Sequence, residues 1–299
     1  MKFDIVILGS GPAGLASALY SSRAGRKVSI LGGTPGGQMG RIAELENYPG
    51  THGRISGMDL FETMKNQAVG FGAEFMGDSA ENIQKGKESY IIKTTLGNEI
   101  EARAVIVATG AEARRLGVPG EAEFTGRGVS FCATCDGNFY KNMTVIVVGG
   151  GNSALSEALH LSHIAKSVII SYRKGEFSRT EKILNDRVAS RPNIRVEFNS
   201  EIAEIAGGDF VQKVIMKDGR EIPADGVFIA IGHIPNTGFL PGGLPLDADG
   251  RLITIPNKTQ IEGTGIFAAG DVRSGSPKQA IVAAGQGAQA AMEANEYLG

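Results

Sequence analysis

Short apolar runs alternate with longer amphipathic stretches along the chain, a pattern typical of strands that alternate with helices. The first such unit has a strand at Phe3–Leu8, a glycine turn, a helix to about Ala24 and a strand at Lys27–Leu31. The same order recurs with a strand at Thr144–Val148, a second helix and a strand at Ser167–Ser171. Strand–helix–strand units of this kind build parallel sheets, so we expect an α/β fold.

Two further helices and several strands are expected from the remaining apolar positions. Leu60, Met64 and Ala68 fall on one face of a helix over Met58–Gly72. The Ala-rich segment Lys278–Leu298 is expected to form the last helix. The other apolar runs predict strands at Tyr90–Thr94, Ala104–Ala108, Gly226–Ile231 and Ile266–Ala269.

Each of the two strand–helix–strand units carries a glycine-rich turn of the form G-x-G-x-x-(G/A). In such a turn the first glycine permits the bend, the second lets a pyrophosphate approach, and the third small residue lets helix and strand pack closely. Backbone N–H groups and the helix dipole then hold the phosphates. A turn of this sequence can also stand without a ligand, but two copies in this context favour two dinucleotide sites and two Rossmann-like domains. The turns are Gly9-Ser10-Gly11-Pro12-Ala13-Gly14 and Gly149-Gly150-Gly151-Asn152-Ser153-Ala154.

The residues after the second strand of each unit distinguish the two sites. Leu31-Gly32-Gly33 stands where a Rossmann fold usually has an acid for the ribose, which leaves that contact unassigned. In the second unit Tyr172-Arg173-Lys174 follows the strand, and Arg179 comes a little later. Basic groups without a carboxylate suit the 2′-phosphate of NADPH better than the ribose hydroxyl of NADH. The alternative interpretation is an ordinary solvated basic turn.

The two cysteines of the chain, Cys132 and Cys135, form a C-x-x-C pair. This spacing favours a redox couple over a zinc site, which would need four ligands, so we expect no metal. Thiols so placed can close a local disulfide, and one of them readily becomes the thiolate that thiol–disulfide exchange requires. Asp136 can act as acid or base for a thiol proton. It can equally be a helix N-cap, and the two roles are compatible.

Composition excludes several other classes of protein. A chain of 299 residues suffices for two domains, and a net charge of −2 with scattered charges indicates neither a nucleic-acid partner nor a polybasic membrane segment. No apolar run is long enough to span a bilayer. The turn at Gly9 cuts the N-terminal apolar stretch too short for a signal peptide, so we expect a cytoplasmic location.

The segment Phe131–Gly137, followed by Phe139-Tyr140, resembles the active-site segment of low-molecular-weight thioredoxin reductases, which are FAD-dependent pyridine nucleotide-disulfide oxidoreductases of bacterial and archaeal type. The resemblance extends over essentially the whole chain. Its other motifs occur in the family's order at Gly36-Gly37-Gln38, Glu46–Gly50, Ala108–Ala111, Gly149–Ala154, Gly232–Asn236, Ala269–Val272 and Lys278-Gln279-Ala280, where the family usually has Arg first.

The resemblance implies a homodimer with one FAD per subunit. It implies a discontinuous FAD domain, residues 1–112 and 240–299, and an inserted pyridine-nucleotide domain, residues 113–239, that carries the cysteine pair. Electrons would pass from NADPH through FAD and the Cys132–Cys135 pair to a protein disulfide, typically of thioredoxin or a thioredoxin-like protein. In the family pattern Cys132 attacks that disulfide and Cys135 faces the flavin. The inserted domain would rotate about hinges near residues 111–113 and 235–239.

The resemblance also implies which residues hold the cofactors, with Asp271 suited to a ribityl hydroxyl of FAD. The residues expected at FAD are Gly9, Gly11, Pro12, Ala13, Gly14, Gly36, Gly37, Gln38, Asn47, Thr109, Gly110, Gly270, Asp271, Lys278, Gln279 and Ala280. Those expected at the pyridine nucleotide are Gly149, Gly151, Asn152, Ser153, Ala154, Arg173, Lys174 and Arg179.

One departure from the family leaves the electron donor open. The family's NADPH signature is His-Arg-Arg followed shortly by Arg, whereas this chain has Tyr172-Arg173-Lys174 and an Arg179 displaced by about one position. Lysine is a point charge without the bidentate fork of arginine. The alternatives are therefore the same flavin–dithiol chemistry with ferredoxin as donor, or a small-molecule dithiol oxidase that uses oxygen. A flavin-binding redox sensor is the non-enzymatic alternative.

Overall fold

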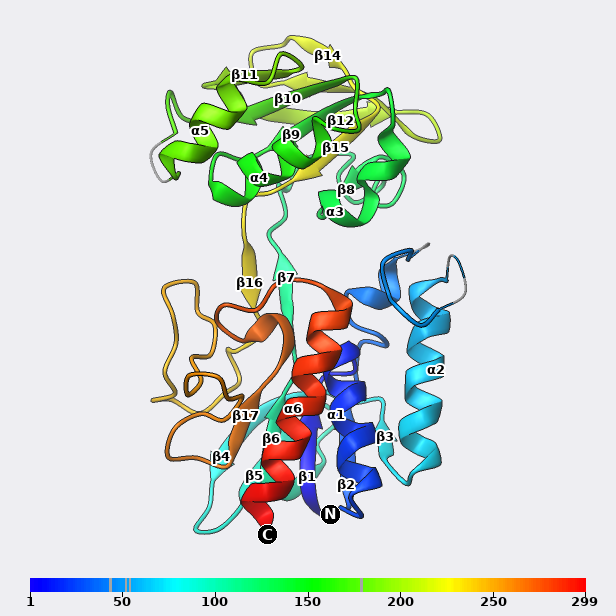
Figure 1. The fold of residues 1–299 in the computed structure, drawn as a ribbon, viewed down its shortest axis with the longest axis vertical. Coiled ribbons are helices and arrows are strands. Elements are labelled where there is room, and N and C mark those ends of the chain that lie inside the picture. The colour runs from blue at the N-terminus through cyan, green and yellow to red at the C-terminus, as the bar shows by residue number, and fades with distance from the viewer. Residues whose placement is uncertain (43–44, 52, 54, 178–179) are drawn as a thin grey trace. The chain divides into compact units, whose positions relative to one another are not determined.

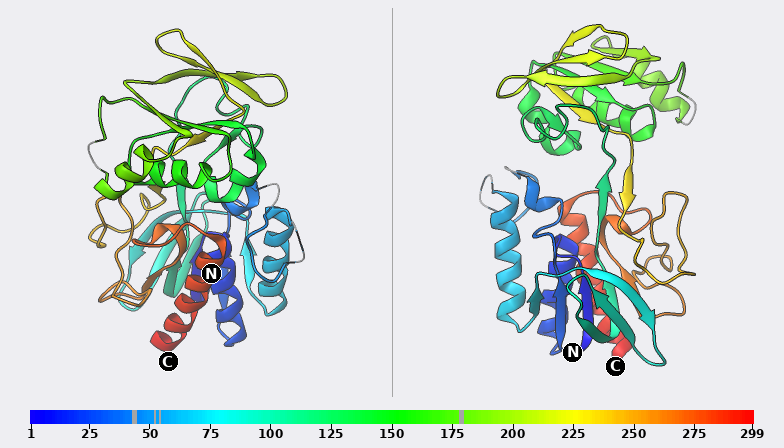
Figure 2. Two further views of the ribbon diagram at one scale, coloured as in Figure 1. Left: turned by 45° about the horizontal axis from the view of Figure 1, so that its top comes forward. Right: turned by 180° about the vertical axis from the view of Figure 1, so that it is seen from behind.

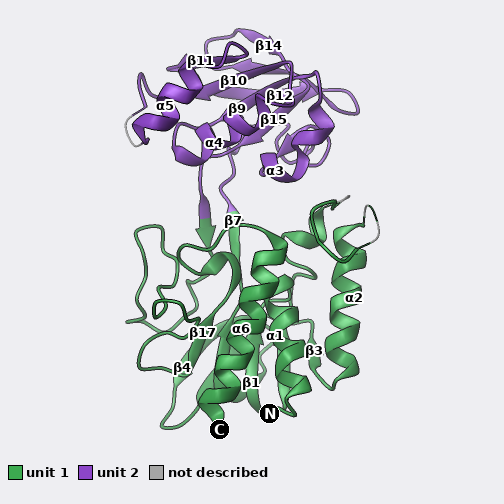
Figure 3. Cartoon of the chain, in the orientation of Figure 1, with its two compact units in different colours: residues 1–112, 234–299 green, residues 113–233 purple. Residues whose placement is uncertain are grey.

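The computed structural model of the chain describes residues 1–42, 45–51, 53, 55–177 and 180–299 (Figure 1). It consists of two compact units, which Figure 3 colours separately. Unit 1 comprises Met1–Glu112 and Ile234–Gly299, and unit 2 comprises Ala113–His233. Each unit has its own sheet, built around parallel strands, and its own apolar core.

The second boundary between the units lies at Ile234, not at the expected position 240. The physical reason is packing, since Phe239 and Leu240 lie against the apolar core of unit 1. The two connecting segments, β7 (Ala111–Ala113) and β16 (His233–Pro235), pair with each other as a two-stranded sheet.

Unit 1 is built on a seven-stranded sheet of order β3-β2-β1-β6-β5-β4, with β17 also paired to β6. The strands that pair in parallel are β1, β2, β3, β6 and β17, while β5 pairs antiparallel with both β4 and β6. The strands are β1 (Lys2–Leu8), β2 (Val28–Leu31), β3 (Glu74–Met76), β4 (Ala80–Lys85), β5 (Tyr90–Thr94), β6 (Glu99–Val107) and β17 (Ile266–Ala268). The helices are α1 (Pro12–Arg23), α2 (Gly57–Gly70), α6 (Ala280–Leu298) and the short 3-10 helices η1 (Met39–Arg41) and η3 (Gly270–Val272).

Alternate residues of β1 enter different cores because successive side chains of a strand point to opposite faces. Ile5 and Ile7 pack with the helices α1, α2 and α6, whereas Val6 and Leu8 pack with Leu252 and other residues of the opposite face. Helices α1 and α6 lie side by side on the helical face, as both views in Figure 2 show. With both faces covered, the parallel strands are continuous apolar runs.

Unit 2 has a five-stranded parallel sheet of order β11-β10-β9-β15-β8 and a separate antiparallel sheet of order β12-β13-β14. The parallel strands are β8 (Val129–Ser130), β9 (Thr144–Val148), β10 (Ser167–Tyr172), β11 (Ile194–Phe198) and β15 (Gly226–Ile229). The antiparallel strands are β12 (Ile202–Gly207), β13 (Val211–Met216) and β14 (Glu221–Pro223). The helices are α3 (Ala133–Asp136), η2 (Gly137–Tyr140), α4 (Asn152–Leu161) and α5 (Lys182–Ala189).

The prediction of an α/β fold with two Rossmann-like sheets is confirmed. Among the predicted strands, the boundary that differs most from the structure is the start of β6, which lies at Glu99 and not at the predicted Ala104. Its first half alternates between exposed and buried residues because it pairs with the antiparallel β5, and only the second half is continuously apolar. Within the part of the chain that the structure describes, no helix is both long and apolar enough to cross a membrane.

Candidate functional site

The expected FAD residues of unit 1 gather at one edge of its sheet. The strands β1, β2, β6 and β17 are parallel, so their carboxyl ends meet at that edge, where ligands of open α/β sheets bind. The segments Gly9–Gly14, Gly36–Gln38, Thr109-Gly110 and Gly270-Asp271 follow these strands in the same order. Gln279 is the N-cap residue of α6, and Ala280 is its first residue.

The glycine turn after β1 is packed on one side and open on the other. Gly9 has φ +105°, and a side chain there would overlap the carbonyl oxygen of Ala108. A Cβ on Gly14 would overlap the carbonyl oxygen of Gly9. A Cβ on Gly11 would have nothing nearer than the carbonyl oxygen of Gly36, at 3.9 Å. The turn thus fits a pyrophosphate group of FAD, which approaches the backbone at the second glycine.

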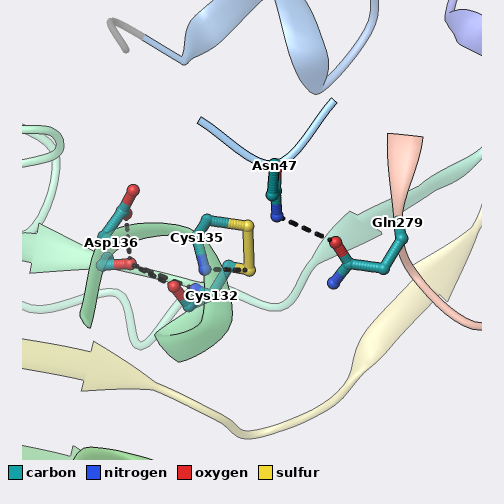
Figure 4. Close-up of a disulfide and its surroundings, with 6 residues drawn as sticks. Asn47, Cys132, Cys135, Asp136 and Gln279 are labelled. Carbon is teal, nitrogen blue, oxygen red and sulfur yellow. Dashed lines mark hydrogen bonds between the residues drawn. A yellow bond between two sulfur atoms is a disulfide. The ribbon is translucent and has the colours of Figure 1, made fainter. Parts of the chain in front are cut away.

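Polar side chains of unit 1 are fixed around this edge by hydrogen bonds. The Asn47 Nδ2 group donates to Gln279 Oε1 at 3.2 Å (Figure 4). The Gln38 amide donates to the carbonyl oxygen of Ala111. Thr109 Oγ1 donates to the carbonyl oxygen of Asn236 at 2.8 Å, and the Asn236 amide donates back to the carbonyl oxygen of Thr109 at 3.0 Å.

Asp271 is half-buried at the turn after β17. Burial raises the pKa of its carboxyl, and the positive charges of Lys278 and Arg251 oppose that rise. Gln286 fixes the same turn, because its Oε1 accepts from the Gly270 N–H at 2.8 Å and from the Ser276 hydroxyl at 3.0 Å. Gln286 was not predicted as a site residue, since a glutamine on a helix carries no sequence signal for such a contact.

The missing ribose acid after β2 has a steric explanation. A Cβ on Gly32 would lie 2.6 Å from the Phe75 ring and 2.7 Å from the Ser10 Cβ. A Cβ on Gly33 would overlap the Ser79 hydroxyl. Neighbouring side chains therefore fill the space that a carboxylate at either position would need.

The second glycine turn, after β9, has the same division between packed and open positions. A Cβ on Gly149 would overlap the carbonyl oxygen of Ala230, and Ala154 is fully buried. A Cβ on Gly151 would meet no atom within 4 Å among the described residues. Asn152 is held at the start of α4, because its Oδ1 accepts from the Glu181 N–H at 2.9 Å. Ser153 is exposed beside it.

The basic turn after β10 presents Arg173 and Lys174 to solvent. Two hydrogen bonds of 3.0 Å fix the turn, from the Asn199 N–H to the Lys174 carbonyl and from the Ser200 N–H to the Tyr172 carbonyl. The Tyr172 ring covers Gly150 so closely that a Cβ there would overlap it. Arg179 lies outside the residues that the structure describes.

The cysteine pair lies at the carboxyl end of β8, which is parallel to β15 and hence at the ligand-binding edge of the unit 2 sheet. Cys132 and Cys135 form a disulfide with a Cα–Cα distance of 5.3 Å, drawn in Figure 4. Both residues are half-buried. The Cys135 N–H donates to Cys132 Sγ at 3.2 Å, a contact that would stabilise negative charge on this sulfur.

Asp136 ends α3 directly after the pair and is half-buried. Burial raises the pKa of its carboxyl, and a hydrogen bond from the Ser130 hydroxyl opposes the rise. Asp136 stands at the N-cap position of η2, but among the described residues its side chain caps no helix N–H group. Ser130 was not predicted as a site residue, because a strand of two residues gives no periodic signal in the sequence.

Comparisons with known proteins identify the family to which the chain is similar. A model of the family described as pyridine nucleotide-disulphide oxidoreductase matches residues 3–287. A thioredoxin reductase of Rickettsia felis is 44% identical over 98% of this chain and 97% of that protein. A thioredoxin reductase of Streptomyces clavuligerus is 41% identical over 99% of this chain and 94% of that protein. The crystal structure of thioredoxin reductase from Streptococcus pyogenes superposes with a TM-score of 0.92 at 38% identity, covering 99% of this chain and 98% of that chain.

Proposed function

Because the chain belongs to the pyridine nucleotide-disulphide oxidoreductase family and, within it, to the thioredoxin reductases, we propose that it reduces a protein disulfide of the thioredoxin type with electrons from NADPH. The observation that carries the proposal is the Cys132–Cys135 disulfide at the same sheet edge as a dinucleotide turn. Because the relatives are thioredoxin reductases by name, thioredoxin or a thioredoxin-like protein is the expected partner. We extend to the chain the homodimeric assembly that the resemblance implies.

Unit 1 is the proposed FAD-binding unit. The open face of Gly11 would take the pyrophosphate, and Asp271 would bind a ribityl hydroxyl. The hydrogen-bonded pair Asn47 and Gln279 and the side chain of Gln38 supply amides for the rest of the cofactor. FAD, when bound, supplies a carrier that accepts two electrons from a nicotinamide and passes them to a dithiol.

The reduced cysteine pair would carry out thiol–disulfide exchange. The Cys132 thiolate bonds to one partner sulfur, the partner S–S bond breaks, and Asp136 protonates the departing sulfur. Cys135 then gives its proton to the Asp136 carboxylate and bonds to Cys132, which releases the second partner sulfur as a thiolate. Two electrons have moved to the partner, and the Cys132–Cys135 disulfide is closed again.

NADPH is the proposed donor at unit 2. Gly151 leaves room for its pyrophosphate, and Arg173 and Lys174 would pair with the 2′-phosphate. Their exposure on a turn fixed by two hydrogen bonds supports this assignment. Arg179 is proposed to join them on the sequence pattern alone.

We expect NADPH to reduce the bound flavin under anaerobic conditions at a lower concentration than NADH, because only NADPH carries the 2′-phosphate that would pair with Arg173 and Lys174. The measurement is the loss of flavin absorbance during separate titrations. Reduction by dithionite but by neither nucleotide would point to ferredoxin as donor. Oxygen uptake with small dithiols and no nucleotide would indicate the oxidase instead.

Replacing Gly151 by Ala is expected to weaken NADPH binding about tenfold or more, because the added methyl group occupies the approach of the pyrophosphate. The fold should not change, since a Cβ there meets no described atom within 4 Å. Calorimetric titration with NADPH measures the effect. Gly70→Ala is the control, because its Cβ also meets nothing described within 4 Å but lies in unit 1. Equal affinity in Gly151→Ala and the native protein would contradict the nucleotide assignment.

A further inference from the structure

The hydroxyl of Ser130 forms hydrogen bonds with both the backbone of Cys132 and the carboxylate of Asp136. It is the last residue of β8 and is 4% exposed. Its Oγ accepts from the Cys132 N–H at 3.1 Å and donates to Asp136 Oδ2 at 2.6 Å. A hydroxyl has a single proton, and the Asp136 carboxylate at 2.6 Å is a much nearer acceptor than the Cys132 carbonyl oxygen at 3.4 Å, so the bond to the carboxylate sets its direction. The result is an ordered chain from the Cys132 backbone through Ser130 to Asp136.

We propose that Ser130 is a positioning residue for disulfide exchange, whose hydroxyl links the Asp136 carboxylate to the backbone N–H of the attacking cysteine and favours its ionised form. The proposal rests on the proposed function. A carboxylate can rotate about its side-chain torsions, and the hydrogen bond from the Ser130 hydroxyl restrains that rotation for Asp136. A short hydrogen bond to a charged oxygen is about twice as strong as one between neutral groups.

The bond also sets the proton affinity of Asp136. Burial raises the pKa of this carboxyl, and the Ser130 hydrogen bond works against burial because it stabilises the charged form. Loss of the hydroxyl therefore leaves burial unopposed and raises the pKa further. An Asp136 with a raised pKa gives its proton to the departing partner sulfur less readily, and while it keeps that proton it cannot take one from Cys135.

Other titratable groups on the elements packed against α3 are Tyr140 on η2 and Glu157 and His160 on α4. Burial and the charge of Asp136 raise the pKa of Tyr140 to about 12, so this phenol stays neutral near neutral pH. Glu157 takes part in an interaction of its own, and the Asp136 side chain accepts a hydrogen bond from Ser130. Replacement of His160 by Gln is the control, because it removes the imidazole on α4 and leaves Ser130 and Asp136 in place.

The test uses the oxidised holoenzyme with ¹³C-labelled aspartate, and the Asp136 carboxyl resonance is assigned by its loss in Asp136→Asn. Ser130→Ala and Ser130→Val are expected to raise the midpoint of its titration by about one pH unit. Ser130→Thr keeps the hydroxyl and should restore the native midpoint, although threonine and valine have the same shape. Ser200→Ala, which removes another buried hydroxyl of unit 2, and His160→Gln should leave the midpoint unchanged.

The rate of exchange between dithionite-reduced protein and oxidised thioredoxin provides the second readout. The part of the rate's pH dependence that comes from Asp136 is the part that disappears in Asp136→Asn. In Ser130→Ala and Ser130→Val the midpoint of this part should rise by the same number of pH units as the carboxyl titration. Equal midpoints in the valine and threonine variants would overturn the proposal, as would a rate that falls equally at every pH. The carboxyl titration needs neither donor nor partner, so it tests Ser130 even if the native protein reduces no thioredoxin and the proposed function fails.

Discussion

Replacing Cys132 or Cys135 by Ser is expected to lower disulfide reduction by roughly 10³-fold or more, because a serine hydroxyl can neither form a disulfide nor ionise near neutral pH. Both variants should remain yellow and keep FAD. The segments proposed to hold FAD belong to unit 1, whereas both cysteines belong to unit 2. Turnover with thioredoxin and the ratio of flavin to protein are the two measurements.

The two cysteine variants should differ in what they trap. Cys135→Ser keeps the Cys132 sulfur and the backbone N–H of residue 135 that donates to it. It should therefore attack thioredoxin and stop at a mixed disulfide, since no second thiol remains to resolve it. Cys132→Ser lacks the attacking sulfur and should accumulate far less adduct. Mass spectrometry of the unreduced mixture distinguishes them. Full activity in either variant, or loss of flavin from both, would remove the assignment of the pair.

The sheet edges of both sites were predictable from the sequence because they depend on local patterns. The boundaries of β9 and β5 agree with the predicted strands, since polar or glycine residues bound each apolar run. Once the strands are parallel, the segments after them must meet at one edge, whatever their distance along the chain. This geometry brings Gly9–Gly14 and Asp271 to the same edge of unit 1.

Residues that act through tertiary contacts were not predictable in this way. Ser130 belongs to a strand of two residues, and its role depends on the turn that returns Asp136 to it. Gln286 reaches back from α6 to the Gly270 N–H, a contact that no helical periodicity encodes. The glycines after β2 are explained by Phe75 and Ser79, which become neighbours only when β3 pairs with β2.

Replacing Gly287 by Ala is expected to destabilise unit 1 by about 2–3 kcal/mol, the cost of overpacking a close contact. Gly287 is buried in α6 where this helix crosses α1, and a Cβ there would overlap the carbonyl oxygen of Ala13. Ser17 ties the contact together, because its hydroxyl bonds both the Ala13 carbonyl, at 2.8 Å, and the Gly287 carbonyl, at 2.9 Å. The methyl group therefore forces α6 away from α1 or displaces the first turn of α1.

Flavin content should fall together with stability in Gly287→Ala, because Ala13 belongs to the glycine turn proposed for the FAD pyrophosphate. The control lies two positions earlier on the same helix. Gly285 is exposed, and a Cβ there meets no described atom within 4 Å, so Gly285→Ala should gain about 0.5–1 kcal/mol from helix propensity. The measurements are thermal unfolding and the flavin-to-protein ratio of both variants. They show the effect of the same added methyl group at a packed position, 287, and at an open one, 285. Equal stability and equal flavin content in Gly287→Ala and Gly285→Ala would contradict the prediction. They would mean that α6 and α1 accommodate the methyl group without disturbing the glycine turn before α1.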